Sequence, residues 1–454
     1  MNVLSVPFIG ITVFSFALVW LAGVRYQKWT VMLCSILFIA LLKPSKLDLA
    51  YLCFLYLFVL IMGRLISGNG KLIWLGTAVP AAGLCFFKYA GYFSAWNRAM
   101  PLGLSFFTFK AISYLADVYR EKAKPAEPVL LFDYLYFFPT YQAGPINRAE
   151  AFFRQMEAPA DFSYTDQKHG CVQAAAGIFE KIVIADFLAN MCSRFLNPEL
   201  TGMYTVFGMI LYTFQIYVDF DAYSNVAVGV ARMLGIHLER NFHTPYMAQN
   251  IRDFWRRWHI SLSSWLRDYI YIPLGGSRKG KARKWLNTMA IFLVSGIWHG
   301  STLMFVFWGL GHGLVSVIED MIRHGRKDTD NPFLRAAGIL VNFVIVMLLW
   351  VFFRSASMPE ALLIFRHMAA VTQQPAVHWY DAGLTLNEWR WLWILLAMTI
   401  GSDILRNRLD MVEWLGSRKT WVRWGIYFAM MVIAIVFGIY GPGYDPQNFI
   451  YITF

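Results

Sequence analysis

His299 lies between two glycines at the end of an apolar stretch, in the segment Gly296-Ile297-Trp298-His299-Gly300. An ionisable side chain inside a membrane costs about 2.5–3.5 kcal/mol on insertion scales, so its presence there favours a functional role. A neutral imidazole near pH 7 suits the removal of a proton from a weak nucleophile such as a hydroxyl. The two glycines leave space beside the ring for a substrate or another backbone. The plainer alternative is that His299 makes a hydrogen bond between helices.

A second histidine, His259, lies in a segment rich in tryptophan and arginine that runs from Phe254 to Tyr269. Tryptophan rings beside arginine side chains are typical of a helix at the membrane–water interface, and this explains most of the segment without catalysis. It does not explain His259. A third histidine, His312, is expected to form hydrogen bonds between helices rather than to transfer protons.

The elements that position these residues are predicted to lie in a membrane. The chain has 454 residues, 58% of them hydrophobic and 15% charged, and its mean hydropathy is +0.46. Apolar stretches of roughly 15–20 residues, long enough to cross a bilayer as helices, recur along the chain. The predicted fold class is all-α, a polytopic membrane protein with about 11 transmembrane helices. Re-entrant or interfacial helices are expected as well, because runs 102–116 and 131–144 are too short or too polar to span simply.

A single membrane domain covering residues 1–454 is the simplest interpretation, since no long repeat and no sizeable polar segment divides the chain. The first apolar stretch, Val6–Ala22, lacks the features of a cleaved signal peptide and is expected to be a retained helix. The five cysteines have no metal-ligand spacing, so they are expected to be packing residues, and no metal site is predicted.

The formal net charge of +12 comes largely from lysines and arginines in short loops, which indicates membrane topology rather than nucleic-acid binding. The basic stretch from Arg252 to Lys284 should face the cytoplasm. The same rule then places both termini on the outer side.

Several motifs together resemble the membrane-bound O-acyltransferase (MBOAT) family. They are spread over most of the chain: Pro101–Phe106, Phe138–Thr140, Gly144–Arg148, Asp219–Ser224, Asn241–Phe242, Pro245–Tyr246, Trp258–His259, Leu266–Gly276 and Trp298–Gly300. Within that family, the chain is similar to the bacterial members that acetylate alginate or cellulose and to those that transfer D-alanine to teichoic acids.

The resemblance implies that the helices surround a central channel, and it also implies a role for particular residues. It makes His299 the catalytic base and His259 a second essential histidine on the cytoplasmic side of a buried channel. The residues expected to bind substrate are Trp258, Arg257, Ser261, Arg267, Asp268, Trp298, Asn241 and Arg148. No bound cofactor is implied, because the acyl donor is itself a thioester substrate, either acetyl-coenzyme A or an acyl carrier protein.

The chain ends in an aromatic pattern, F-x-Y-x-x-F, within the tail of residues 441–454. One interpretation is an aromatic anchor at the membrane interface. The other follows from the resemblance, because similar C-terminal motifs occur on exporting acyltransferases or their partner peptides, and it makes Tyr451 a transient acyl carrier. Both interpretations stay open at this point.

The function implied is the transfer of an acyl group, most simply acetyl, from a cytoplasmic thioester to an extracytoplasmic polysaccharide, with a periplasmic or extracellular acyltransferase as partner. A multi-pass protein of the bacterial inner membrane, surrounded by lipid, is expected. The alternative within the family is D-alanyl transfer to teichoic acid-like polymers. Alternatives of other classes are a lipid or glycan transporter and a silent scaffold for a polysaccharide synthase, and the absence of repeats weighs against the transporter.

Overall fold

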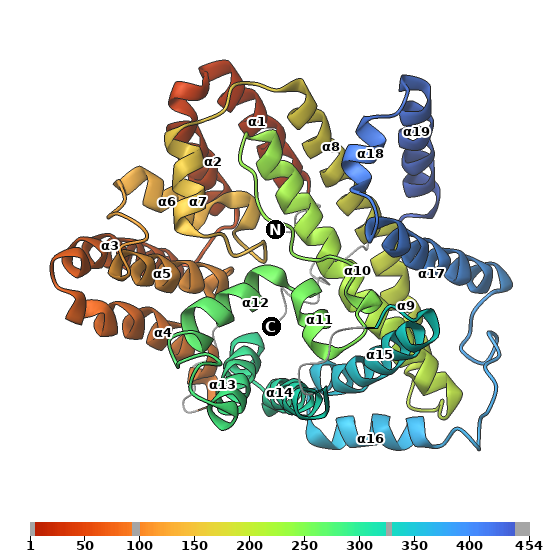
Figure 1. Ribbon diagram of the computed structural model, residues 1–454. Helices are drawn as coiled ribbons and strands as arrows, with labels where there is room; N and C mark the ends of the chain where they lie inside the picture. Colours follow the sequence, from red (N-terminus) through yellow and green to blue (C-terminus); the bar gives the residue numbers. More distant parts are fainter. Residues whose placement is uncertain (1–4, 93–99, 324–328, 441–454) are drawn as a thin grey trace. The chain divides into compact units, whose positions relative to one another are not determined.

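The computed structural model describes residues 5–92, 100–323 and 329–440, and within these ranges the chain is helical and contains no strand (Figure 1). The prediction of an all-α fold is therefore confirmed. Contacts within the chain divide it into two compact units. The first contains the described residues up to Ile178 together with Tyr223–Arg240, and the second contains Phe179–Ala222 together with the described residues from Asn241 onward. That the whole chain forms one domain stays a prediction.

Six helical segments of the described chain are long and apolar enough to cross a membrane. They are Val24–Leu41, Lys46–Gly68, Gly70–Tyr92, Leu303–Arg323, Pro332–Arg354 and Thr420–Phe437. These segments support a multi-pass membrane protein. The number of about 11 transmembrane helices, like the orientation of the loops and termini, stays a prediction.

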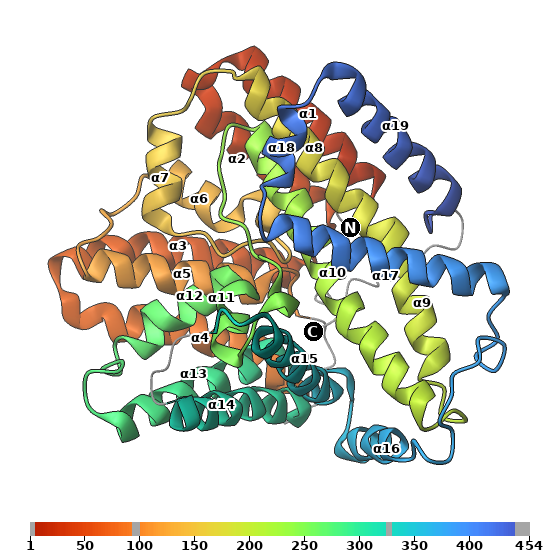
Figure 2. The ribbon, with the colours of Figure 1, turned by 45° about the vertical axis from the view of Figure 1, so that its right-hand side comes forward.

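Among the described residues, the first unit contains helices α1 to α8 and the C-terminal part of a longer helix, α10. They are α1 (Val6–Ala22), α2 (Gln27–Leu41), α3 (Lys46–Gly68), α4 (Ile73–Tyr89), α5 (Leu104–Tyr119), α6 (Pro128–Tyr136), α7 (Ala149–Glu157), α8 (Tyr164–Phe179) and the end of α10 (Met203–Met233). Helices α3, α4 and α5 lie side by side (Figure 2). Almost every side chain of α5 is buried, as expected for a short apolar run enclosed by protein.

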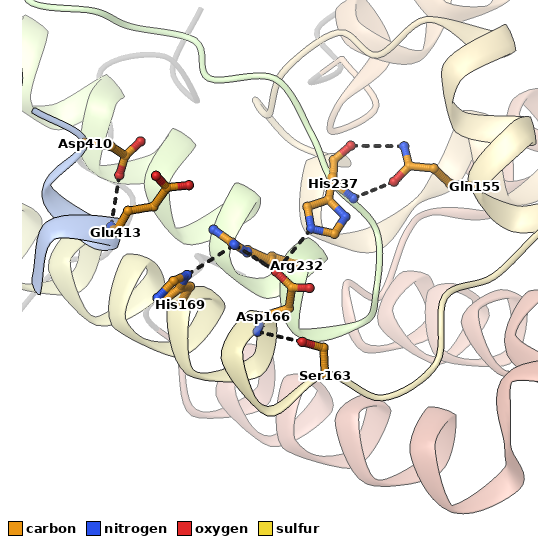
Figure 3. A network of polar contacts seen from close by, with 8 residues as sticks. All are labelled: Gln155, Ser163, Asp166, His169, Arg232, His237, Asp410 and Glu413. Atoms are coloured by element: carbon orange, nitrogen blue, oxygen red, sulfur yellow. Dashed lines mark hydrogen bonds and ion pairs between the residues drawn. The ribbon is translucent and has the colours of Figure 1, made fainter. Parts of the chain in front are cut away.

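The two chain segments of the first unit are joined by a polar network (Figure 3). The Arg232 guanidinium on α10 donates two hydrogen bonds to one oxygen of Asp166 on α8, at 3.1 and 2.8 Å. The same guanidinium lies 3.3 Å from Nδ1 of His169. Beyond the helix, the backbone N–H and carbonyl of His237 both pair with the Gln155 side chain, at 2.7 and 3.1 Å. These contacts fix the end of α10 within this unit.

The second unit holds the remaining helices. They are α9 (Asp186–Phe195), the first part of α10, α11 (Ile251–Arg257), α12 (Ile260–Leu266), α13 (Lys281–His299), α14 (Leu303–Arg323), α15 (Pro332–Arg354), α16 (Met358–Ala369), α17 (Leu386–Arg406), α18 (Met411–Gly416) and α19 (Thr420–Phe437). Helices α13 and α14 run side by side in both views (Figures 1 and 2). A short loop joins them, so they form an antiparallel pair.

Buried ion pairs connect the segment after α8 to α10 and α17 in the second unit. Lys181 pairs with Asp219 at 2.6 Å and with Asp186 at 2.8 Å. Arg406 pairs with Asp221 at 2.6 Å and also with Glu180. Because a buried charge is costly unless it is paired, this arrangement accounts for the two aspartates of the Asp219–Ser224 motif.

The cysteines follow the expectation in part. Cys34 and Cys192 are buried, as packing residues should be. Cys53, Cys85 and Cys171 are exposed, so for these three the prediction of a packing role is wrong. Each lies on a helix, on the side that faces away from the protein interior. An apolar run does not reveal which of its faces is packed against protein and which faces outward.

Candidate active site

His299 is the last residue of α13, and that helix also contains Trp285. The helix is continuous between the two residues, and their separation along it is roughly 21 Å at 1.5 Å per residue. This places the imidazole at the opposite end of the helix from the basic loop. Its depth in a membrane stays a prediction.

The orientation of the His299 ring is set by the backbone of its own helix. Its Nδ1 lies 2.7 Å from the carbonyl oxygen of Ser295, one turn earlier. Because a carbonyl oxygen accepts hydrogen bonds and cannot donate them, Nδ1 carries the proton in this contact. The lone pair of the neutral ring is therefore on Nε2, which makes Nε2 the nitrogen able to take a proton from a substrate.

The His299 imidazole is 3% exposed and is enclosed by aromatic rings. The ring centroids of Trp308, Trp298 and Phe353 lie 4.7, 4.9 and 5.6 Å away. These rings come from α13, α14 and α15. They exclude water from the imidazole, and hydrogen bonds to a reacting group are stronger in such surroundings.

The glycines beside His299 serve the packing of helices. A Cβ atom added at Gly296 would clash with the backbone carbonyl of Phe305, and one added at Gly300 would overlap the Phe305 ring. On the facing helix, a Cβ at Gly309 would clash with the carbonyl of Phe292. Of the two uses expected for this space, a substrate or another backbone, the described structure fills it with α14.

His259 occupies a break between two short helices. It has a positive φ of 42°, and its side chain is fully buried. Residues 254–269 therefore do not form one interfacial helix, because α11 ends at Arg257 and α12 starts at Ile260. Left-handed backbone is uncommon outside glycine, asparagine, aspartate and histidine, so the break also depends on the residue type.

Asn241 holds His259 in place. Its Oδ1 lies 3.1 Å from Nδ1 of His259 and accepts hydrogen bonds from the hydroxyl and backbone N–H of Ser261, at 2.9 and 3.3 Å. With Nδ1 as the donor, Nε2 of His259 also carries the lone pair. Three predicted site residues, from two segments of the chain, thus lie together.

Trp298 connects the two histidines. Its ring centroid lies 4.9 Å from that of His299 and 6.1 Å from that of His259. The His259 ring also packs edge-on against Phe220, at 4.8 Å. Both predicted catalytic histidines therefore belong to one buried aromatic cluster in the second unit.

The other predicted binding residues differ in burial and in the partners that they contact. Trp258 is fully buried in the aromatic cluster, stacked on Phe254 at 5.5 Å. Arg257 pairs with Asp253 at 3.0 Å and donates to Asn407 at 3.0 Å, so its charge already has a structural use. Arg267 pairs with the adjacent Asp268 at 2.8 Å and is largely exposed.

Two predicted site residues have no established position relative to His299. Arg148 belongs to the first unit, whereas the histidines belong to the second. Tyr451 lies outside the described residues. Their roles stay predictions.

Sequence reasoning missed the rings that complete the cluster, notably Trp308, Trp350 and Phe353. Trp308 lies four residues before His312 on α14, and that helical spacing is a signal that would have placed it on the same face. His312 itself follows the prediction, because its Nδ1 accepts a hydrogen bond from Nε1 of Trp255 at 3.3 Å and thereby links α14 to α11.

Comparison with known proteins identifies relatives of this chain. The chain is similar to a probable alginate O-acetylase of Pseudomonas putida, with 32% identity over 77% of this chain and 76% of the relative. It is 30% identical to a peptidoglycan O-acetyltransferase of Helicobacter pylori over 78% of this chain and 76% of that protein. A teichoic acid D-alanyltransferase of Bacillus subtilis is 29% identical over 68% of this chain and 84% of the relative.

Residues 26–358 match the model of the membrane-bound O-acyltransferase family. The matched range contains both histidines, Asn241 and the aromatic rings of the cluster. By this match and by its relatives, the chain belongs to the membrane-bound O-acyltransferase family and is an acyltransferase.

Proposed function

We propose that this acyltransferase moves an acyl group, most simply acetyl, from a thioester donor on the cytoplasmic side to a hydroxyl of an extracytoplasmic polysaccharide. The bacterial inner membrane is its proposed location. The observation that carries the proposal is the fixed orientation of the buried His299, whose Nδ1 is held by the Ser295 carbonyl. The names of the relatives, an alginate O-acetylase and a peptidoglycan O-acetyltransferase, support acetyl as the acyl group and a polysaccharide as the acceptor.

The proposed reaction uses the lone pair on Nε2 of His299. Nε2 removes the proton of the acceptor hydroxyl, whose oxygen attacks the thioester carbonyl carbon. The tetrahedral intermediate then collapses, the carbon–sulfur bond breaks, and the thiolate takes the proton from the imidazolium. The products are the ester and the free thiol, so no cofactor or metal is required. In this scheme His259 is a second histidine of the same site. Asn241 holds its ring by a hydrogen bond, and the Trp298 ring lies against it.

The donor in this proposal is acetyl-coenzyme A or an acyl carrier protein, which would approach the basic stretch Arg252–Lys284. Positive side chains there suit the phosphates of either donor. Family membership favours an enzyme over a transporter or a scaffold. The likeness to the Bacillus subtilis teichoic acid D-alanyltransferase favours a second candidate, D-alanyl transfer from a carrier protein.

The C-terminal Tyr451 is proposed as a relay. Its phenol would accept the acyl group as an aryl ester, which an extracytoplasmic partner enzyme then passes to the polymer. Tyr451→Phe removes the hydroxyl and keeps the aromatic ring. Normal surface acylation by that variant would exclude the relay and leave direct transfer to the acceptor.

The test of the function is a comparison of two buried histidines. His299→Phe is expected to lower the rate of surface-polymer acylation by about 10²–10⁴-fold, the usual contribution of a general base. His312→Phe is the matched control, since the ring of His312 stacks between Phe254 and Phe292 and a phenyl ring preserves that packing. The measurement is the amount of acyl ester released from the cell-surface polymer at equal protein levels. Unchanged acylation in His299→Phe would contradict the proposed function.

A further inference from the structure

Buried hydrogen-bond donors without a partner are rare, because removing such a group from water without a hydrogen bond is costly. Among the described residues of the second unit, Nε1 of Trp258, Nε1 of Trp308 and Nε2 of His312 are fully buried and have no hydrogen-bond partner. Nε2 of His312 is a donor, since its Nδ1 accepts the bond from Trp255. Three N–H groups of one aromatic cluster therefore lack an acceptor.

Trp308 is distinguished from the other two by its contact with the proposed base. Its ring centroid lies 4.7 Å from that of His299, at an interplanar angle of 63°. The rings of Trp258 and His312 instead contact other members of the cluster, such as Trp350 at 5.0 and 6.2 Å. Of the three N–H groups, that of Trp308 therefore belongs to the ring in contact with the proposed base.

Packing holds the Trp308 ring firmly. It stacks on Trp350 at 5.7 Å and 18°, and it meets Phe353 edge-on at 5.1 Å. Trp350 is buried to the same degree, but its own Nε1 donates to the hydroxyl of Tyr246 at 3.2 Å. The two stacked tryptophans therefore differ in their hydrogen bonds. The N–H of Trp350 donates a hydrogen bond within the protein, and the N–H of Trp308 does not.

We propose that Nε1–H of Trp308 donates a hydrogen bond to the acyl carbonyl oxygen and stabilises the negative charge that forms there during transfer. This inference rests on the proposed function of His299. When the acceptor oxygen attacks the carbonyl carbon, the π electrons of the carbonyl move onto its oxygen, and a fixed donor in a dry site stabilises that charge most. When the carbon–sulfur bond breaks, the carbonyl reforms and the charge leaves with the thiolate. The missing partner of Trp308 is then a substrate oxygen.

The experiment compares Trp308→Phe with Trp350→Phe. Both substitutions exchange an indole for the smaller phenyl ring in the same stack. Purified full-length protein in lipid nanodiscs is given acetyl-coenzyme A at varied concentration together with oligosaccharide fragments of the cell-surface polymer as the hydroxyl acceptor, and release of the free thiol is followed. Trp308→Phe is expected to lower kcat by about 10²–10³-fold with little change in KM, because the bond strengthens in the transition state. Trp350→Phe reports the cost of a smaller ring in the same stack, and its loss of kcat should be much smaller than that of Trp308→Phe.

A second variant separates the N–H from the shape of the ring. Replacing Trp308 by β-(3-benzothienyl)alanine exchanges the indole N–H for sulfur in a ring of nearly the same size, so it should show the same loss of kcat while the protein stays folded and monodisperse.

The outcomes distinguish the two proposals. If His299→Phe abolishes thiol release and the Trp308 variants match Trp350→Phe, the role of Trp308 is overturned and the proposed function stands. If His299→Phe releases thiol as fast as the wild type, or if the wild type releases no thiol from acetyl-coenzyme A in the presence of that acceptor, the proposed acetyl transfer from acetyl-coenzyme A fails and the role of Trp308 fails with it.

Discussion

At the scale of single residues, the two histidines of the site are fixed by different means. The Nδ1 atom of His299 is held by a backbone carbonyl, which no side-chain substitution at Ser295 removes. The Nδ1 atom of His259 is held by the side chain of Asn241. The orientation of His259 should therefore be sensitive to a single substitution, whereas that of His299 should be resistant.

This difference gives a prediction for Asn241→Ala and Ser295→Ala. Loss of the Asn241 side chain removes a hydrogen bond to His259, and the net worth of such a bond, about 0.5–1.5 kcal/mol, corresponds to a roughly two- to tenfold lower rate of acyl transfer. Ser295→Ala leaves the carbonyl in place and should change the rate less than twofold. Rates of acyl transfer by the two variants at equal protein levels provide the measurement. A greater loss in Ser295→Ala than in Asn241→Ala would show that the hydroxyl, rather than the carbonyl, orients His299.

At the scale of elements, the pair α13 and α14 positions both His299 and Trp308. Gly296 and Gly309 lie where each helix approaches the backbone of the other, so a methyl group at either position would force the helices apart. Small residues allow this close approach in membrane proteins, where van der Waals packing between helices replaces much of the hydrophobic driving force.

We predict that Gly309→Ala destabilises the protein by about 1–3 kcal/mol, the usual cost of overpacking a tight interior. The matched control is Gly401→Ala on α17, where an added methyl group would have no neighbour within 4 Å. There the gain in helix propensity should stabilise the protein by roughly 0.5–1 kcal/mol. Thermal unfolding in detergent measures both effects. If the two variants unfolded at the same temperature, the contact between α13 and α14 would not be as close as described.

At the scale of the whole molecule, the first unit depends on contacts between chain segments that are distant in sequence. Asp166 and Arg232, which are 66 positions apart, form its ion pair between the two segments. Partial burial alone would raise the pKa of Asp166, but the hydrogen bonds and charges of Arg232 and His237 outweigh it and hold that pKa below its ordinary value.

A lowered pKa of Asp166 predicts how stability depends on pH. The carboxylate contributes in full at pH values above the unfolded-state pKa of about 3.9, and its contribution is lost as the pH falls through the folded-state value. Because the pair is partly solvated, it should contribute only about 0.2–1 kcal/mol. The difference in melting temperature between wild type and Asp166→Asn should have its full value at about pH 5 and shrink below about pH 4. A difference that grew as the pH fell from about 5 to about 3 would have the wrong sign for this pair.

Much of the site could be predicted from the sequence because its residues stand out locally. His299 is an ionisable group in an apolar run, and Asn241, His259 and Ser261 lie in motifs of recognisable residue types. Residues that act by packing carry no such signal. Trp308 is one of 18 tryptophans in the chain, and its significance depends on which ring it meets and on whether its N–H has a partner.

The sequence by itself determined the helical membrane class and the acyltransferase family, and it singled out the two histidines as candidates, because apolar length, short motifs and polar residues within apolar runs are local properties of a chain. The tertiary structure decided the remainder. In the structure, α14 fills the space beside the glycines, the helix is interrupted at His259, and rings from three helices enclose His299. These features depend on distances between residues far apart in sequence, which residue types and spacing do not specify.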